Sequence, residues 1–194
     1  METTSSKKRE EILDVAEHMI RVAGYNGFST RGVADAVGIK AASVYYYFPS
    51  KPDIGVAVTE RYTDRFIESL GDPESFPKKS PKVVKAYIDA FRHALVKDKK
   101  LCLCVVLGAE SGGLPPDVSH RTKIFFSKNL EWLQTAFKSS FDLKPADSRR
   151  RANLVLASVE GGLVLSCSLY DNSIFEDIAA SLLNYFNSKS VLPH

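Results

Sequence analysis

The segment from Phe28 to Lys51, FSTRGVADAVGIKAASVYYYFPSK, carries the side chains whose types and spacing point to chemistry. Small residues at Ala41 and Ala42 precede three consecutive tyrosines. Small side chains at the start of a helix can approach the base edges of a DNA major groove, and hydroxyl groups can bind phosphate oxygens. The segment therefore predicts a surface that binds double-stranded DNA.

Two short helices joined by a tight turn must present these side chains. Ser29 is placed to cap a helix over residues 30–37, whose apolar side chains recur on one face. Gly38 ends that helix, because glycine adopts the left-handed conformation of a sharp turn without a steric penalty. A second helix is expected over residues 41–47.

Val44 and Phe48 lie four positions apart and anchor one face of this second helix. Successive helical positions are rotated by about 100°, so the three adjacent tyrosines cannot all point into a core. At least one of them must face outward. This rules out packing as the common role of all three.

The segment resembles the helix-turn-helix of the TetR family of bacterial transcriptional repressors, over roughly residues 6–66. The residues that match the family pattern are Ala34, Gly38, Ile39, Tyr45, Tyr47, Phe48, Ser50 and Lys51, with Gly24 and Phe28 upstream. Ala41 and Ala42 depart from it, since the family often carries longer or polar side chains there. Base contacts at these two positions would then be methyl contacts to thymine.

The resemblance implies a role for each matched position in DNA binding. Arg31 is the candidate for a guanine edge or a phosphate, and Lys51 for a phosphate at the start of its own helix. The other candidates are Lys40, Ala41, Ala42 and Ser43 for base edges, Tyr45 and Tyr47 for phosphates, and Tyr46 for a phosphate or a thymine methyl. One short helix offers little specificity, so a two-fold homodimer on a pseudo-palindromic operator is expected, with recognition helices about 34–36 Å apart.

Composition agrees with a globular intracellular protein. Of the 194 residues, 44% are hydrophobic and 25% charged, and the net charge is only +3. Three cysteines do not suggest a disulfide framework, and the N-terminus does not resemble a signal peptide. No stretch approaches the roughly 18 uninterrupted apolar residues of a membrane span, so we expect a cytoplasmic protein with no membrane partner. Lys7, Lys8 and Arg9 form either a basic arm that reaches phosphates or a solvated tail.

Helical periodicity continues through the rest of the chain, and the predicted fold is all-α with about nine helices. Further helices are expected over residues 6–23 (closed by Gly24), 51–70, 83–97, 101–109, 117–141, 146–170 and 174–188. Residues 71–81 are predicted to be a loop between domains. We expect a DNA-binding domain over residues 6–66, with its motif at 29–48, and a ligand-binding and dimerisation domain over 80–190.

The middle helices are predicted to enclose an apolar or aromatic small-molecule effector, although for each candidate taken singly core packing is the favoured interpretation. The candidates are Tyr87, Phe91, Phe125, Phe126, Trp132 and Tyr170. Cys102 and Cys104 offer an alternative, sensing of electrophiles or oxidants, but they point about 200° apart on a helix and cannot easily pair. Buried, inert cysteine is the competing interpretation. Glu110, if inside, would be a polar anchor for ligand or a partner for Arg121 or Lys123.

The last two helices are the expected dimer surface, with a purely intramolecular core as the alternative. Gly161 and Gly162 lower helix propensity, which a close helix approach would explain. The apolar candidates are Leu154, Leu165, Leu169, Ile178, Leu182 and Phe186.

Two rival classes remain. An enzyme is disfavoured, because the histidines have no metal-ligand spacing and neither a G-x-S-x-G nor a G-K-[ST] motif is present, so no cofactor or metal is expected. A helix-turn-helix protein that organises DNA without sensing a ligand would not need a large helical domain with aromatic faces.

Overall fold

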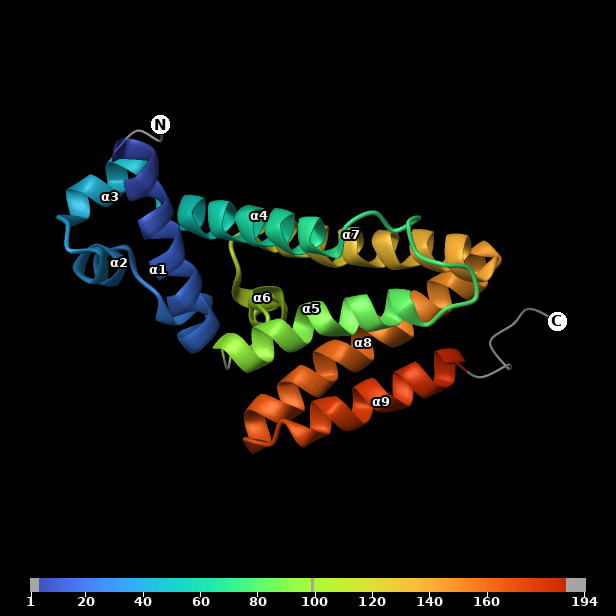
Figure 1. Cartoon of the computed structure of the whole chain (residues 1–194). Coiled ribbons are helices and arrows are strands. Elements are labelled where there is room, and N and C mark those ends of the chain that lie inside the picture. The colour runs from blue at the N-terminus through green and yellow to red at the C-terminus, as the bar shows by residue number, and fades with distance from the viewer. Residues whose placement is uncertain (1–3, 99, 188–194) are drawn as a thin grey trace. The chain divides into compact units, whose positions relative to one another are not determined.

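The computed structural model describes residues 4–98 and 100–187, and these form nine α-helices and one short 3₁₀ helix, without a strand (Figure 1). The helices are α1 (Thr4–Gly27), α2 (Thr30–Val37), α3 (Ala41–Tyr47), α4 (Lys51–Leu70), α5 (Lys82–Asp98), α6 (Leu103–Ala109), α7 (Pro116–Phe141), α8 (Pro145–Leu169) and α9 (Ser173–Asn187), and the 3₁₀ helix η1 (Ser111–Gly113) lies between α6 and α7. The all-α prediction is confirmed. Residues 188–190 of the predicted second domain lie outside the described residues.

The turn between α2 and α3 forms as the sequence predicts. The Ser29 hydroxyl accepts a hydrogen bond from the Gly32 N–H at 3.0 Å, which caps α2. Gly38 then adopts φ 74° and ψ 35°, and the Ile39 N–H donates to the Ala34 carbonyl at 3.0 Å. A left-handed glycine therefore closes α2 and redirects the chain into α3 within three residues.

Helix α1 differs from its prediction at its end. Gly24 interrupts the helix with φ 77° and ψ 171°, as a closing glycine should, but a last turn continues to Gly27. The positive φ at residue 24 requires glycine, and a Cβ there would also displace the end of the Glu110 side chain, whose Oε1 would lie 1.9 Å away.

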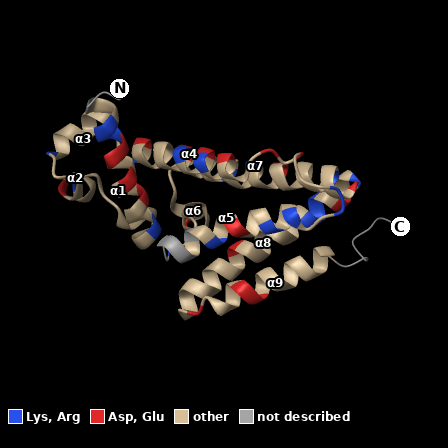
Figure 2. Ribbon diagram, in the orientation of Figure 1, with Lys and Arg blue, Asp and Glu red and all other residues tan. Residues whose placement is uncertain are grey.

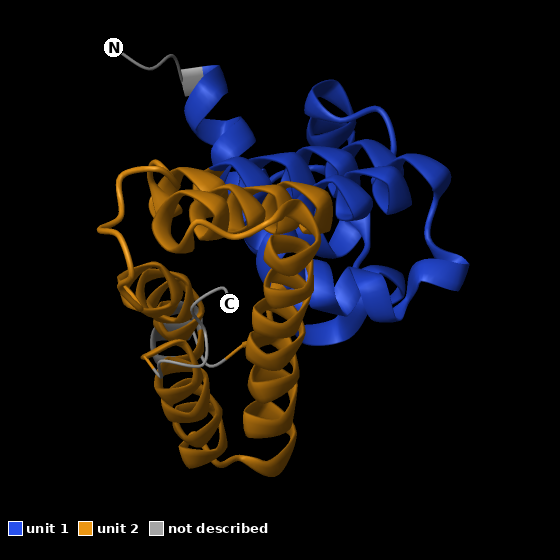
Figure 3. Cartoon of the chain, turned by 90° about the vertical axis from the view of Figure 1, so that its right-hand side faces the viewer, with its two compact units in different colours: residues 1–64, 103–125 blue, residues 65–102, 126–194 orange. Residues whose placement is uncertain are grey.

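The described chain divides into two compact units, coloured separately in Figure 3. Unit 1 comprises residues within 1–64 and 103–125, and unit 2 comprises residues within 65–102 and 126–194. Helices α4 and α7 contribute residues to both. The division differs from the predicted boundaries near 66 and 80, because α6 and the first part of α7 group with the N-terminal helices.

The loop over residues 71–81 belongs to unit 2, so it does not separate two domains as predicted. The Trp132 indole N–H donates to the Gly71 carbonyl at 2.8 Å, and Phe76 packs edge-on against the same indole. The Lys79 N–H donates to the Ser140 carbonyl at 2.7 Å. These contacts hold the loop along α7.

Helix α8 is long and apolar enough to cross a membrane by length and composition alone. Core helices of soluble bundles pass the same test, and 44% of its most apolar window is buried inside the protein. Its apolar composition therefore has a structural explanation in the packing of α8 against α5 and α9.

We predict that Gly38→Ala lowers the free energy of unfolding by about 1–2 kcal/mol, because a Cβ strains the left-handed conformation even where space is open. Gly112→Ala is the matched control, since residue 112 also has open space but no positive φ. Denaturant unfolding followed by circular dichroism at fixed protein concentration measures both. Equal stability of the two variants would contradict the assigned turn.

Candidate functional site

Helix α3 presents its tyrosines to solvent. Tyr45 is 51% exposed and Tyr46 80% exposed, whereas Tyr47 is half-buried and contacts Tyr46 edge-on. Val44 and Phe48 are buried beneath them. The prediction that the tyrosines cannot all be core is confirmed, and two phenol rings stand free to contact another molecule.

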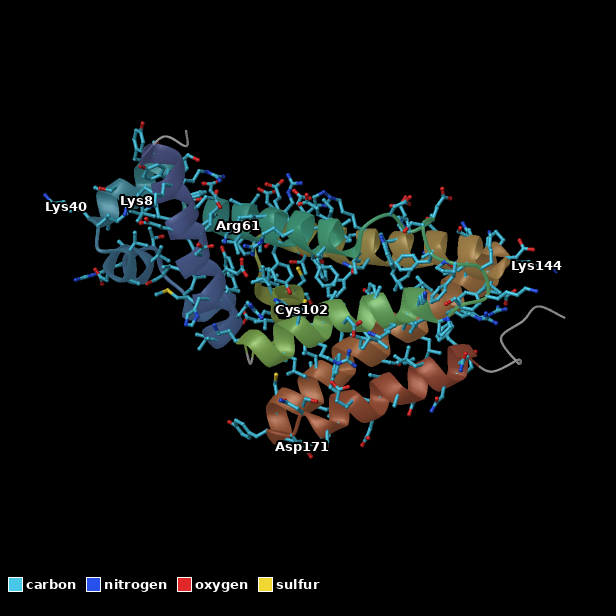
Figure 4. The ribbon with its side chains drawn as sticks, in the orientation of Figure 1. Lys8, Lys40, Arg61, Cys102, Lys144 and Asp171 are labelled. Carbon is cyan, nitrogen blue, oxygen red and sulfur yellow. The ribbon has the colours of Figure 1, made fainter. Side chains whose placement is uncertain are left out.

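The predicted base-reading positions share this exposed surface. Arg31 on α2, Lys40 before α3, and Ala42 and Ser43 on α3 are exposed, and Ala41 is partly so. Lys40 extends away from the helices in Figure 4. The small residues at the start of α3 leave its backbone accessible between these longer side chains, which suits entry into a groove.

Lys51 is held more firmly than the sequence suggested. Its Nζ lies 4.7 Å from the ring centroid of Tyr25 and 4.8 Å from that of Phe28, a double cation–π contact. Partial burial lowers the pKa of Lys51, against the opposing charge of Glu110. The two rings fix the ammonium at the start of α4, where the helix also favours an anion.

Residues 7–9 do not form an arm ahead of the first helix, because they lie within the first turns of α1. Lys7 is exposed there, whereas Lys8 and Arg9 contact other side chains. The Arg9 guanidinium sits 5.1 Å from the Phe48 ring centroid, and Lys8 forms an ion pair with Glu11. A helical backbone from Thr4 onward fixes these side chains on the surface of α1.

A cluster that the sequence analysis missed ties α4 to α1. Nη1 of Arg61 donates to Glu10 at 2.8 Å, and Nη2 pairs with Asp14 at 2.9 Å and with Glu17 at 3.2 Å. Figure 2 shows the acidic residues along α1, and Figure 4 labels Arg61 on α4. Burial acts to lower the pKa of Arg61, but the hydrogen bond to Glu10 and the nearby carboxylates outweigh it and raise that pKa. We call this cluster the Arg61 clamp.

Glu110 is neither a pocket residue nor a partner of Arg121. Its Oε2 accepts hydrogen bonds from the Asn26 backbone N–H at 3.3 Å and from the Asn26 side chain at 3.1 Å. Arg121 instead pairs with Glu60 at 2.8 Å. Glu110, just after α6, thereby secures the last turn of α1.

The predicted effector residues are divided between the units. Tyr87, Phe91 and Trp132 form an aromatic cluster in unit 2, where the Tyr87 hydroxyl donates to Asn129 Oδ1 at 2.8 Å. Phe125 is buried in unit 1 against Tyr62. Tyr170 occupies the left-handed position after α8 and is 97% exposed, so it does not belong to the buried aromatic cluster, but it lines a surface groove of unit 2.

The three cysteines differ in their unit and in their exposure. Cys102 belongs to unit 2 and Cys104 to unit 1, both fully buried, whereas Cys167 on α8 is half-exposed. Burial makes both predicted sensor thiols inaccessible in this conformation. Cys102 instead lies beside Glu160, a buried carboxyl that the sequence analysis did not single out.

The dimer candidates fall into two groups. Leu154, Leu165 and Leu169 are exposed on α8, and no atom lies within 4 Å of a Cβ built on Gly161. Leu182 and Phe186 are buried in the protomer, where Phe186 stacks on Phe137 with a 5.1 Å centroid separation, so Phe186 does not supply free surface. Gly162 faces Ile178 of α9, which explains one glycine within the chain.

A capped helix, a glycine turn and a short exposed second helix define a helix-turn-helix DNA-binding domain. Residues 12–58 match the family described as "Bacterial regulatory proteins, tetR family". A TetR transcriptional regulator from Legionella pneumophila is 30% identical with a TM-score of 0.85, covering 95% of this chain and 98% of that one. The chain belongs to the TetR family of transcriptional regulators.

Two other proteins are similar to this chain in part of the sequence or in fold. An uncharacterized HTH-type transcriptional regulator in the dhlA 5′ region of Xanthobacter autotrophicus is 34% identical over 65 residues, which is 34% of this chain and 32% of that protein. The match thus spans about a third of that relative. The regulator FadR from Bacillus subtilis, solved in complex with stearoyl-CoA, shares the fold with a TM-score of 0.75 at 17% identity, covering 92% of this chain and 97% of that one.

We predict that Arg61→Met lowers the free energy of unfolding by about 1–3 kcal/mol, because it leaves three carboxylates of α1 without their shared cation. The magnitude stays below that of a fully buried pair, since Asp14 is largely exposed. Arg121→Met is the control: its pair with Glu60 is exposed and should contribute at most about 1 kcal/mol. A larger loss in Arg121→Met would contradict the importance of the Arg61 clamp.

Proposed function

We propose that the protein is a dimeric transcriptional repressor that releases its operator when a small molecule binds the C-terminal helices. The observation that carries this proposal is the exposure of Tyr45 and Tyr46 on a helix anchored only by Val44 and Phe48. Phenol hydroxyls at these positions would bind phosphates, and the start of α3 would meet base edges. Lys51 would hold a further phosphate at the start of α4.

A second protomer supplies the specificity that one short helix lacks. The exposed apolar stripe on α8, defined by Leu154, Gly161, Leu165 and Leu169, follows helical spacing along one face. A groove between α8 and α9, lined by residues that include Leu154, Ile178 and Tyr185, runs beside it. Side chains of an identical stripe would fill this groove in a two-fold interface, which is self-complementary by symmetry.

Helix α4 offers a physical route from effector to DNA. Its Phe66 packs edge-on against Phe91, with centroids 4.8 Å apart, in the aromatic cluster of unit 2. Five residues earlier on the same helix, Arg61 clamps α1. An effector that displaces the aromatic cluster would move Phe66, and the rigid helix would carry that movement to the clamp. Only a difference in effector affinity between the two states can drive the change.

This role places the protein in the cytoplasm, where its DNA is. Among the described residues, no group of three or more His, Cys, Asp or Glu side chains is arranged to hold a metal ion. The proposal assigns no catalytic step to the chain.

We predict that Tyr45→Phe weakens binding to a specific duplex about tenfold, because it removes one hydrogen bond to a charged phosphate and leaves the ring in place. Tyr170→Phe is the matched control, as Tyr170 is a 97% exposed tyrosine outside the proposed dimer groove. Fluorescence anisotropy with a duplex enriched from a random pool by the wild-type protein gives both affinities. Unchanged affinity in Tyr45→Phe would remove the assigned phosphate contact.

We predict that Leu165→Glu raises the dimer dissociation constant more than about tenfold, because two-fold symmetry brings a pair of like charges to an apolar interface. Leu165 is 47% exposed in the protomer, so the change should leave the fold intact. Val22→Glu, at an apolar residue of α1 that is 64% exposed, is the control. Sedimentation equilibrium showing equal dissociation constants for both variants would place the dimer surface elsewhere.

A further inference from the structure

Glu160 is a charged residue in the apolar middle of α8 and is only 7% exposed. Neither of its carboxyl oxygens has a hydrogen-bond partner of ordinary geometry. The polar group that acts on it is the thiol of Cys102, which is a weak donor. A buried acid without a strong donor is unfavourable for folding, so its presence calls for another explanation.

Among the residues that the structure describes, no cation acts on Glu160 to compensate for its burial. Burial raises the pKa of Glu160 to about 8, with Cys102 opposing the rise. The neighbouring Tyr87 is also affected: burial and the nearby Glu160 and Cys102 raise the pKa of Tyr87 well above its usual value. The Tyr87 hydroxyl is already committed to Asn129, so it does not donate to the carboxyl.

Glu160 lies on the seam between α5 and α8, two helices that pack together in unit 2 (Figure 1). On α5, Tyr87, Phe91 and Leu95 recur every four residues and are all buried. On α8, Glu160 and Cys167 lie seven residues apart, which puts them on one face about 10 Å apart along the axis. This apolar row of α5 therefore runs beside the face of α8 that carries the acid.

The seam opens to solvent at one end. A surface groove there is lined by Leu95, Ser166, Cys167, Tyr170 and Asn172. Leu95 and Cys167 are the outer members of the two rows, and Tyr87 and Glu160 are the inner members. The groove therefore lies at the outer end of the seam, about two helical turns from the Glu160 carboxyl.

We propose that this seam binds the effector, and that the effector is an amphipathic organic cation whose ammonium group pairs with Glu160 while its apolar body lies against Phe91 and Leu95. The inference rests on the proposed ligand-responsive function and names the ligand class. An ammonium brings a compensating charge and up to three donors to two oxygens whose present donor is a weak thiol. Aromatic rings beside the acid add favourable contacts to a cation and its hydrocarbon. An anionic ligand would instead place two like charges together in a buried site.

Three probes of equal length test the charge preference: 4-phenylbutylamine, 4-phenylbutanol and 4-phenylbutyrate. Thermal shift and calorimetric titration at pH 8 are suitable, since Glu160 is then about half ionised and an alkyl ammonium, with a pKa of about 10.4, is still charged. We expect the wild-type protein to bind the amine about tenfold or more tightly than the alcohol, and the carboxylate least. Equal affinities, or no binding of the amine, would overturn the proposal.

Glu160→Gln removes the charge and keeps the shape. A carboxyl whose pKa is raised by folding destabilises the protein above its unfolded value near 4.5, and the loss is complete above about 8, so the variant should be at least as stable at pH 8. It should lose the preference for the amine while still binding the alcohol. Glu131→Gln, at an exposed acid on α7, should retain the preference. An amine preference that survives Glu160→Gln would contradict the pairing. If that variant does not fold, the relative affinities of the wild-type protein for the three probes still test the proposal.

DNA binding is measured separately with the enriched duplex, without any amine. If that duplex binds and the amine does not, the ligand class is wrong and the DNA-binding function stands. If neither binds, the proposed function itself fails. If the amine binds at Glu160 but the duplex stays bound, the binding site is correct, and the proposed coupling between that site and DNA binding is wrong.

Discussion

Helix α3 has seven residues, and isolated helices shorter than about 12–15 residues are marginal in water, so its structure depends on what anchors it. Val44, and Phe48 directly after the helix, are its buried apolar anchors, and both belong to unit 1. Because the two anchors share one face, the adjacent tyrosines must occupy the others. The exposure of the tyrosines, and every functional conclusion drawn from it, follows from this two-residue anchorage.

The anchorage in turn depends on α1, which several independent contacts hold in place. The Arg61 clamp joins it to α4, Glu110 secures its last turn at Asn26, and Arg9 covers the ring of Phe48 itself. These contacts are polar and partly exposed, so each contributes less than the apolar core. Contacts of modest individual strength suit a regulator, because a small difference in ligand affinity between two conformations can then shift the protein from one to the other. Helix α4 reaches from the clamp to the aromatic cluster of unit 2 through Phe66.

Local signals in the sequence predicted the helix-turn-helix well, because Ser29, Gly38 and the apolar spacing each act within a few residues. Contacts between distant residues were not predictable: the spacing of Glu10, Asp14 and Glu17 marks one face of α1, but nothing local identifies Arg61 as its partner. An apolar helix face also does not reveal whether it meets its own protomer or another, which is why Phe186 was misassigned. Glu160 could have been noticed as the single acid in an apolar run, although its burial beside a weak thiol donor depends on how α8 packs.

Selection of duplexes from a random pool by the purified full-length protein tests the central claim most directly, since it requires no knowledge of the operator. An outward α3 presented in duplicate by a two-fold dimer predicts an enriched inverted repeat, with half-sites separated by about one helical turn of 10–10.5 base pairs or a multiple of it. The dimer should bind this repeat, and a duplex with one half-site scrambled should bind far more weakly. Enrichment of no sequence, or of a lone half-site bound by a single protomer, would contradict the account.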